Sequence, residues 1–175
     1  PVFRGCSLPM VVSLTEGRRE DIPYKGPKDP QDNVHGDYLD LPPATIQEQP
    51  VSAVRWLVDT LMASEGDITL IPVGPLTNIA MALRIEPRIA QKIKKIVIMG
   101  GGYKEVNITP TAEFNFWVDP EAAKIVVDSG CEIVIVPLDA THKAVMSLKD
   151  ADELEASSKK AAIATASFIR HRQAG

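Results

Sequence analysis

Three polar side chains lie close together in residues 107–115, a stretch that is otherwise rich in aromatic residues. Glu113 and Asn115 are two residues apart, and Asn107 stands a short distance before them. Each amide can donate and accept hydrogen bonds, and a carboxylate accepts hydrogen bonds from hydroxyl groups. Such a set suits a polyhydroxylated ligand, and the neighbouring aromatic rings can exclude water and strengthen the bonds.

The same residues also have an ordinary structural interpretation, which the pattern alone leaves open. Asn and Glu in a loop before a helix are commonly turn and surface residues, and aromatic side chains commonly belong to the core. The glycines at 100–102 do not form the G-x-G-x-x-G fingerprint of dinucleotide sites, and no helix follows them directly. A nucleotide-phosphate site is therefore disfavoured.

Composition limits the classes of protein that remain. A chain of 175 residues with 45% hydrophobic and 24% charged residues predicts one globular domain over residues 1–175. A net charge of -4 provides no basic face for nucleic acid or an anionic membrane, so we expect neither partner. The absence of a long apolar run or a signal peptide favours a cytoplasmic protein, in which Cys6 and Cys131 are reduced core residues.

Strands and helices alternate along most of the chain. Apolar residues at three- and four-residue spacing predict helices, and short runs of β-branched residues predict buried strands. We expect Thr77 or Asn78 to cap the second helix, and Pro87 to begin a further helical turn. The expected helices are 51–64, 76–85, 119–130 and much of 148–172, and the expected strands are 67–74, 95–102 and 131–139.

This order predicts an α/β fold with an open, mostly parallel sheet and helices on both faces, joined by right-handed crossovers. In such sheets the ligand crevice lies at the carboxyl ends of the strands, which selects the loops after Val73, Met99 and Pro137. Residues 15–50 are polar, rich in Pro, Gly and Asp, and without a period. We expect them to form a long loop or lid beside the binding site.

Several blocks of the sequence together resemble the inosine-uridine-preferring nucleoside hydrolases. The principal blocks are VGPLTNIAMALRIEPRI at 73–89, IVIMGGG at 96–102 and NITPTAEFNFWVDPEAA at 107–123. Supporting blocks are PVFRG at 1–5, NVHGD at 33–37 and LDATHKA at 138–144. The resemblance extends from the first residue to about Ala144, in the order that the family has.

The resemblance implies a Rossmann-like core that hydrolyses the N-glycosidic bond of ribonucleosides, giving ribose and a free base. It also implies a Ca²⁺ ion held by carboxylates, one main-chain carbonyl, water and the ribose hydroxyls, a ligand set that suits this hard cation. Members of the family usually form homodimers or homotetramers. Base preference, purine against pyrimidine, does not follow from this stretch of sequence.

Individual residues take their expected roles from the same resemblance. Val73 would supply the main-chain carbonyl to calcium, and Met99 would lie beside the ribose. Asn107, Glu113 and Asn115 would bind ribose hydroxyls. His35, in NVHGD, would belong to a loop near the pocket, whereas His142 receives no catalytic role and is expected to be structural.

The family's aspartate cluster, its general base and its general acid have no counterparts in these residues. We therefore expect the chain to be an incomplete nucleoside hydrolase domain, inactive by itself and less stable than complete members because sheet edges are left unpaired. One alternative is a truncated, non-catalytic paralogue that binds nucleoside or ribose or assists assembly. Another is an unrelated α/β binding module.

Overall fold

The computed structural model describes residues 1–11 and 45–174 and divides the chain into two compact units. The described part of unit 1 comprises residues 1–11 and 46–143, and that of unit 2 comprises residues 45 and 144–174. The expectation of one domain over residues 1–175 stays a prediction. Most of the expected lid at 15–50 lies outside the described residues. Only residues 45–50 of this segment are described.

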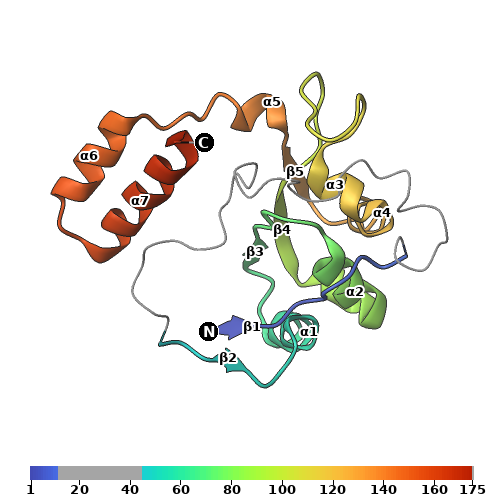
Figure 1. The fold of residues 1–175 in the computed structure, drawn as a ribbon. Coiled ribbons are helices and arrows are strands. Elements are labelled where there is room, and N and C mark those ends of the chain that lie inside the picture. The colour runs from blue at the N-terminus through green and yellow to red at the C-terminus, as the bar shows by residue number, and fades with distance from the viewer. Residues whose placement is uncertain (12–44, 175) are drawn as a thin grey trace. The chain divides into compact units, whose positions relative to one another are not determined.

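A parallel three-stranded sheet forms the centre of unit 1 (Figure 1). Its strands are β3 (Ile68–Leu70), β4 (Ile93–Met99) and β5 (Ile133–Val136), in the order β3-β4-β5. A separate parallel pair joins β1 (Val2–Phe3) to β2 (Glu48–Gln49). The open, parallel α/β architecture predicted from the sequence is confirmed.

Helices connect these strands and follow them. They are α1 (Ala53–Ala63), α2 (Thr77–Ile85), the 3-10 helix η3 (Pro87–Gln91), α3 (Phe114–Val118), α4 (Pro120–Val127) and α5 (Leu138–Thr141). Helix α2 joins β3 to β4, and α4 joins β4 to β5, so right-handed crossovers place both helices on the same face of the sheet, and the expectation of helices on the other face as well stays a prediction. The helix α2 packs against both α1 and α4.

The main core lies between this helical layer and β4. Alternation along the strand directs Ile96 and Ile98 toward the helices and Val97 to the opposite face, on which Val134 of β5 is exposed. Each fully buried aliphatic side chain contributes about 1.5–3 kcal/mol to stability. The largest fully buried apolar side chains of this core are Leu61, Leu76, Ile89, Ile96, Ile98 and Val126.

The segment expected to form a buried strand at 67–74 contains no buried residue and alternates between exposed and partly buried positions. Only Ile68–Leu70 is a strand, and Ile71 and Val73 are 67% and 75% exposed. The prediction failed because β3 is an edge strand among the described residues, and edge position is not visible in a local sequence. The prediction that both cysteines are core residues is also wrong, since Cys6 is exposed and Cys131 only half-buried.

The predicted cap of α2 is wrong as well. The N-cap residue is Leu76, whose side chain makes no capping hydrogen bond. Tertiary contacts use the two polar side chains instead: the Thr77 hydroxyl donates to Asp119 at 2.6 Å, and Asn78 Oδ1 accepts from the Cys6 amide at 2.8 Å. By contrast, the helical turn expected at Pro87 is confirmed as η3.

Unit 2 contains a pair of packed helices, α6 (Leu148–Ala156) and α7 (Lys160–Ala174). Ser147 and Asp150 form a capping box at the start of α6, and Ser158 adopts a positive φ of 56° in the turn between the helices. The helical prediction for residues 148–172 is thus confirmed, with a break at the turn. The small buried core consists of Ala151, Ala166 and Ile169.

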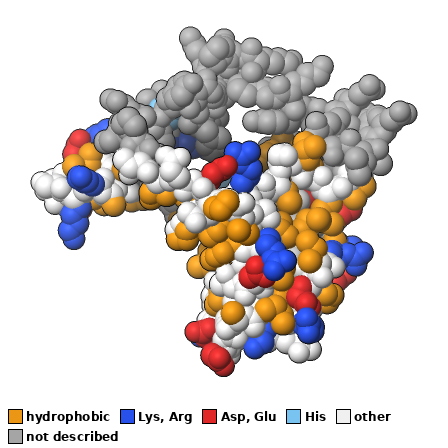
Figure 2. All heavy atoms as spheres, turned by 90° about the horizontal axis from the view of Figure 1, so that it is seen from below, with side chains coloured by type: hydrophobic (Ala, Val, Ile, Leu, Met, Phe, Trp, Pro, Cys, Tyr) orange, Lys and Arg blue, Asp and Glu red, His pale blue; other side chains and the backbone are white. Residues whose placement is uncertain are grey.

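Charged side chains of both signs lie next to one another on the face shown in Figure 2, with apolar patches between them. Ion pairs between oppositely charged side chains occur in unit 1, among them Arg55 with Asp59 and Arg88 with Glu86. Interspersed charges of this kind produce no broad region of one sign on the face in view. None of the described helices combines the length and hydropathy that a membrane span requires.

The fully buried Asp119 connects three parts of unit 1. Its carboxylate caps α4 by accepting from the Ala122 amide at 3.0 Å, as the sequence predicted. The same carboxylate accepts from the Thr77 hydroxyl of α2 and from the Met10 amide at 2.9 Å. Because a buried carboxylate requires such partners, these bonds fix the start of both helices and the N-terminal segment.

Replacing Asp119 with alanine should therefore destabilise the chain. We expect Asp119→Ala to lower the free energy of unfolding by about 2–4 kcal/mol, because it removes a helix cap and leaves buried donors unpaired. Urea denaturation followed by circular dichroism measures this change. The matched control is Asp128→Ala, which removes an exposed carboxylate paired with Lys124 and should change stability by less than about 0.5 kcal/mol. Equal effects of the two variants would contradict the assignment.

Candidate functional site

The carboxyl ends of the three parallel strands meet at one edge of the sheet. The Met99 amide donates to the Pro72 carbonyl at 3.0 Å, and the Gly100 amide donates to the Val136 carbonyl at 3.2 Å. These bonds place the loops after β3, β4 and β5 beside one another. The crevice-forming edge expected from the sequence is therefore present in unit 1.

Asn115 joins the short helix α3 to the end of β4. Its side chain is buried, and its amide nitrogen donates to the Met99 carbonyl at 3.1 Å while lying 3.2 Å from Met99 Sδ. The sequence placed these residues in the same predicted site, and the structure brings them into contact. The helix itself was missed, because a five-residue run rich in aromatic residues lacks the length and periodicity of a recognisable helix.

Glu113 is the N-cap of α3 and is only 3% exposed. Its Oε1 accepts from the Asn115 amide at 2.9 Å, and its Oε2 accepts from the Gly101 and Phe116 amides at 2.8 and 3.3 Å. Three backbone donors stabilise a buried carboxylate strongly. Since each carboxylate oxygen can accept two hydrogen bonds, Oε1 retains capacity for one more donor.

Asn107 differs from the other two polar residues because it is exposed. Its Oδ1 accepts from the Phe114 amide at 3.0 Å, which holds the end of the 102–107 loop against the start of α3. Within the described residues its amide nitrogen has no hydrogen-bond partner, so this nitrogen can donate to a ligand. Two of the three residues predicted to act together are therefore bonded to each other, Glu113 with the Asn115 amide, and Asn107 is bonded to the Phe114 amide that lies between them.

The glycines after β4 serve close packing around Glu113. A Cβ on Gly100 would lie 2.6 Å from a ring carbon of Phe116, and Gly101 has a positive φ of 69°. Both positions therefore favour glycine. This packing role agrees with the absence of a phosphate-binding fingerprint.

A cavity of about 820 Å³ lies beside Glu113, between α4 and the edge strand β5. Phe116 and Trp117 line it together with Lys124 of α4 and Ile135 of β5. Its size falls in the range of small-molecule sites. Val73 does not line this cavity and belongs instead to a second hollow of about 510 Å³, lined also by Trp56 and Asn78.

Calcium ligands are not assembled by the described residues alone. No group of three or more His, Cys, Asp and Glu side chains is placed to hold a metal ion in residues 1–11 and 45–174. Val73 offers a main-chain carbonyl, but calcium takes six to eight oxygen ligands with carboxylates among them. The described donors therefore do not fit a complete calcium site, and the role of Val73 stays a prediction.

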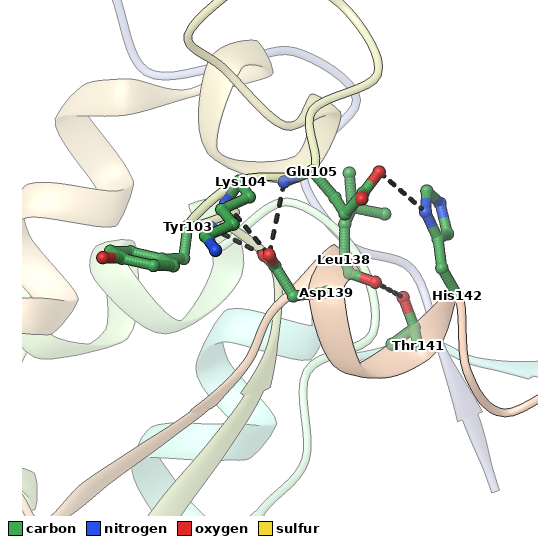
Figure 3. A network of polar contacts seen from close by, with 7 residues as sticks. All are labelled: Tyr103, Lys104, Glu105, Leu138, Asp139, Thr141 and His142. Carbon is green, nitrogen blue, oxygen red and sulfur yellow. Dashed lines mark hydrogen bonds and ion pairs between the residues drawn. The ribbon is translucent and has the colours of Figure 1, made fainter.

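The two histidines considered in the sequence have different outcomes. His35 lies outside the described residues, so its expected place near the pocket stays a prediction. His142 follows α5, and its Nδ1 lies 3.6 Å from Glu105 Oε2 in the 102–107 loop. This contact, drawn in Figure 3, agrees with the structural role expected for it.

Asp139 was missed by the sequence analysis. Its carboxylate accepts from three consecutive backbone amides, those of Tyr103, Lys104 and Glu105, at 2.7, 2.9 and 3.3 Å (Figure 3). The hydrogen bond from the Tyr103 amide is the main reason why the pKa of Asp139 is lowered. The signal available in the sequence was its position as the last residue of the predicted strand 131–139, at the carboxyl end where the crevice was expected.

Comparison with known proteins gives a consistent result. The model of the family described as inosine-uridine preferring nucleoside hydrolase matches residues 1–174. The pyrimidine-specific ribonucleoside hydrolase RihB of Escherichia coli O157:H7 is 54% identical over 118 residues, which are 65% of this chain and 38% of that protein. The chain thus spans about two fifths of the length of the curated relatives that it matches.

Solved structures of the same kind superpose on the chain. A purine-preferring ribonucleoside hydrolase from Gardnerella vaginalis has a TM-score of 0.74 and 30% identity, covering 79% of this chain and 46% of its own. A plant nucleoside hydrolase has a TM-score of 0.78 and 27% identity, covering 98% of this chain and 52% of its own. The similarity therefore extends to both sequence and fold.

Substitution of Glu113 tests the arrangement around Gly101. In Glu113→Gln an amide nitrogen replaces one accepting oxygen, so at least one backbone donor loses its partner. We expect the free energy of unfolding to fall by about 1–3 kcal/mol, with faster hydrogen exchange at the Gly101 or Asn115 amide. Chemical denaturation and exchange measured by NMR report these two effects.

The control for this substitution is Glu132→Gln, which alters an exposed glutamate paired with Lys95 at 2.9 Å. It should change stability by less than about 0.5 kcal/mol. Unchanged exchange at both Gly101 and Asn115 in Glu113→Gln would show that these bonds do not hold the loop.

Proposed function

Since the chain belongs to the inosine-uridine preferring nucleoside hydrolase family, we propose that it forms part of an enzyme that hydrolyses the N-glycosidic bond of ribonucleosides. The products are ribose and the free base. Support comes from the match over residues 1–174 and from relatives named as ribonucleoside hydrolases. The same matches argue against an unrelated α/β binding module.

One observation about the site carries this proposal. Glu113 and Asn115, both buried, are bonded to Gly101 and Met99 at the carboxyl end of β4. Their side chains are fixed before any ligand arrives, which lowers the entropic cost of binding. Glu113 Oε1 has capacity to accept from a sugar hydroxyl, and the Asn107 amide nitrogen can donate to one.

These residues would act by holding the ribose. In hydrolysis a water oxygen bonds to the anomeric carbon, the bond from that carbon to the base nitrogen breaks, and the water's proton is passed on as the base leaves. Positive charge develops on the sugar in the transition state, as in other glycoside hydrolyses. The Asn107 amide nitrogen would donate to one hydroxyl and Glu113 would accept from another, and these bonds would keep the ring oriented. We assign neither general base nor general acid to the described residues.

Calcium remains a proposal for the complete protein. When bound, such an ion would orient the ribose hydroxyls and lower the pKa of the attacking water. Val73, an exposed residue in the loop after β3, would contribute its main-chain carbonyl. The described residues supply no cluster of carboxylates, so the other ligands of such an ion would come from elsewhere in the complete protein.

We further propose a preference for pyrimidine ribonucleosides. The relatives with 53–54% identity are named as pyrimidine-specific, whereas a solved structure named as purine-preferring is 30% identical. Because the pyrimidine-specific relatives are more similar to this chain in sequence, we expect its substrate preference to resemble theirs. Uridine and cytidine should therefore be hydrolysed with a higher kcat/KM than inosine.

Location and assembly can be tested separately from the activity. A net charge of -4 and the mixed charges of Figure 2 support a protein that binds neither nucleic acid nor membrane. We propose that it is cytoplasmic and assembles as a homodimer or homotetramer. Light scattering of the purified protein gives the oligomeric state, and fractionation of cells gives the location.

Asn107 provides the most direct test of the ribose site. In the complete enzyme we expect Asn107→Ala to raise KM for uridine about 5–10-fold with a smaller change in kcat, the effect of losing one hydrogen bond to substrate. Gln91→Ala, which removes an exposed amide from η3, should leave both constants unchanged. Ribose release, followed with a reducing-sugar assay, gives the rates.

Two outcomes would overturn parts of the proposal. An unchanged KM in Asn107→Ala would remove Asn107 from the ribose site. Failure of the complete wild-type protein to release ribose from uridine, cytidine, inosine or adenosine would overturn the proposed function. For residues 1–175 alone we expect no turnover, and ribose above background from this chain would show that it suffices.

A further inference from the structure

The loop of residues 102–107 has almost no apolar anchorage of its own. Residues 102–105 are exposed, and Tyr103 is 86% exposed. A segment without buried side chains is not ordered by the hydrophobic core, so its conformation depends on its hydrogen bonds. This matters because the loop ends at Asn107, the residue whose amide nitrogen is available to a ligand.

Each end of the loop is tied to the candidate site. At its start, the Gly101 amide donates to Glu113 while the Gly101 carbonyl accepts from the Leu138 amide at 3.0 Å. At its end, Asn107 Oδ1 accepts from the Phe114 amide at the start of α3. These bonds fix the two ends of the loop but leave its centre without a partner in the site itself.

The helical turn α5 supplies the contacts to the centre of the loop. Figure 3 shows Asp139 directed toward the backbone of Tyr103, Lys104 and Glu105, with His142 on the same turn directed toward the Glu105 side chain. Both oxygens of Asp139 take part, Oδ2 with Tyr103 and Oδ1 with Lys104 and Glu105. One carboxylate thereby determines the path of three consecutive peptide groups.

A glycine makes this path possible. A Cβ on Gly102 would lie 1.9 Å from the Glu105 carbonyl oxygen, a distance at which the backbone must shift. The absence of a side chain permits the tight turn that directs the next three amides toward Asp139. Gly102 and Asp139 are thus two parts of one arrangement, although they are far apart in sequence.

We propose that Asp139 is a positioning residue for ribose binding, which acts by holding the 102–107 loop so that Asn107 faces the sugar. The inference rests on the proposed function and adds a residue that does not itself contact the substrate. The hydrogen bond from the Tyr103 amide is the first cause that lowers the pKa of Asp139, so its carboxylate is charged at neutral pH. Lys104, Glu105 and His142 are the charged or titratable residues that belong to the same set of contacts. The bonds of Asp139 are lost only as the pH falls through that lowered pKa, below the ordinary aspartate range near 4.

A double-mutant cycle with Asn107 distinguishes positioning from general stabilisation. In Asp139→Asn one accepting oxygen becomes an amide nitrogen, which faces backbone donors and cannot accept from them. In the complete enzyme we expect KM for uridine to rise about 5–10-fold with kcat within about threefold. Because both residues act through the same contact, Asp139→Asn combined with Asn107→Ala should raise KM no more than Asn107→Ala alone.

Hydrogen exchange supplies a readout that does not depend on catalysis. Exchange of the Tyr103, Lys104 and Glu105 amides should accelerate at least tenfold in Asp139→Asn, while Gly101 remains protected by Glu113. Asp139→Glu, which keeps the charge, should recover part of the wild-type KM. The control is Asp59→Asn, an exposed aspartate of α1 paired with Arg55, which should alter neither KM nor exchange in the loop.

Each outcome decides the matter. Additive increases in KM in the double mutant, or unchanged hydrogen exchange at residues 103–105, would overturn the inference. The proposed function would still stand if the wild-type enzyme releases ribose. A wild-type enzyme that releases no ribose would overturn both. If Asp139→Asn does not fold, Gly102→Ala opens the same turn without altering the carboxylate, and an unchanged KM in that variant would equally count against the inference.

Discussion

The three hydrogen bonds accepted by the Glu113 carboxylate are the interaction on which the rest of the site depends. A buried carboxylate is stable only if donors replace the water that it has lost, and here the donors are backbone amides. Those amides belong to α3 and to Gly101, so the same bonds start the helix and set the direction of the chain after β4. Asn115 reaches Met99 because α3 begins where Glu113 caps it.

Two aspartates repeat this use of a carboxylate. Asp119 accepts from Ala122, Thr77 and Met10 in the core, and Asp139 accepts from three amides at the surface. In all three cases one carboxylate holds several donors and so fixes the start of a helix or the path of a loop. The difference lies in burial: the loss of a partner in the core leaves an unpaired donor without water, whereas at the surface water replaces it. Stability should therefore depend mainly on Glu113 and Asp119, and loop order on Asp139.

Features that depend on residues close together in the sequence could be predicted, whereas features that depend on contacts between distant residues could not. Helix α4 was predicted with its cap because Asp119, Pro120 and Glu121 form a local signature. The grouping of Asn107, Glu113 and Asn115 was predicted because these residues are near one another in the chain. In contrast, the exposed edge strand β3 and the tertiary roles of Thr77 and Asn78 depend on distant residues, as does Asp139, whose donors lie more than thirty positions away.

Gly101 uses both of its backbone groups for different neighbours, its amide for Glu113 and its carbonyl for Leu138. Gly101 therefore fixes the positions of two segments at once, the start of α3 after β4 and the start of α5 after β5. Inserting or deleting a residue between Met99 and Gly101 would displace both partners at once, whereas a change in length after Glu105 would leave both bonds intact. Natural variation in the size of this region should accordingly accumulate beyond Glu105 and spare the short run that leads out of β4.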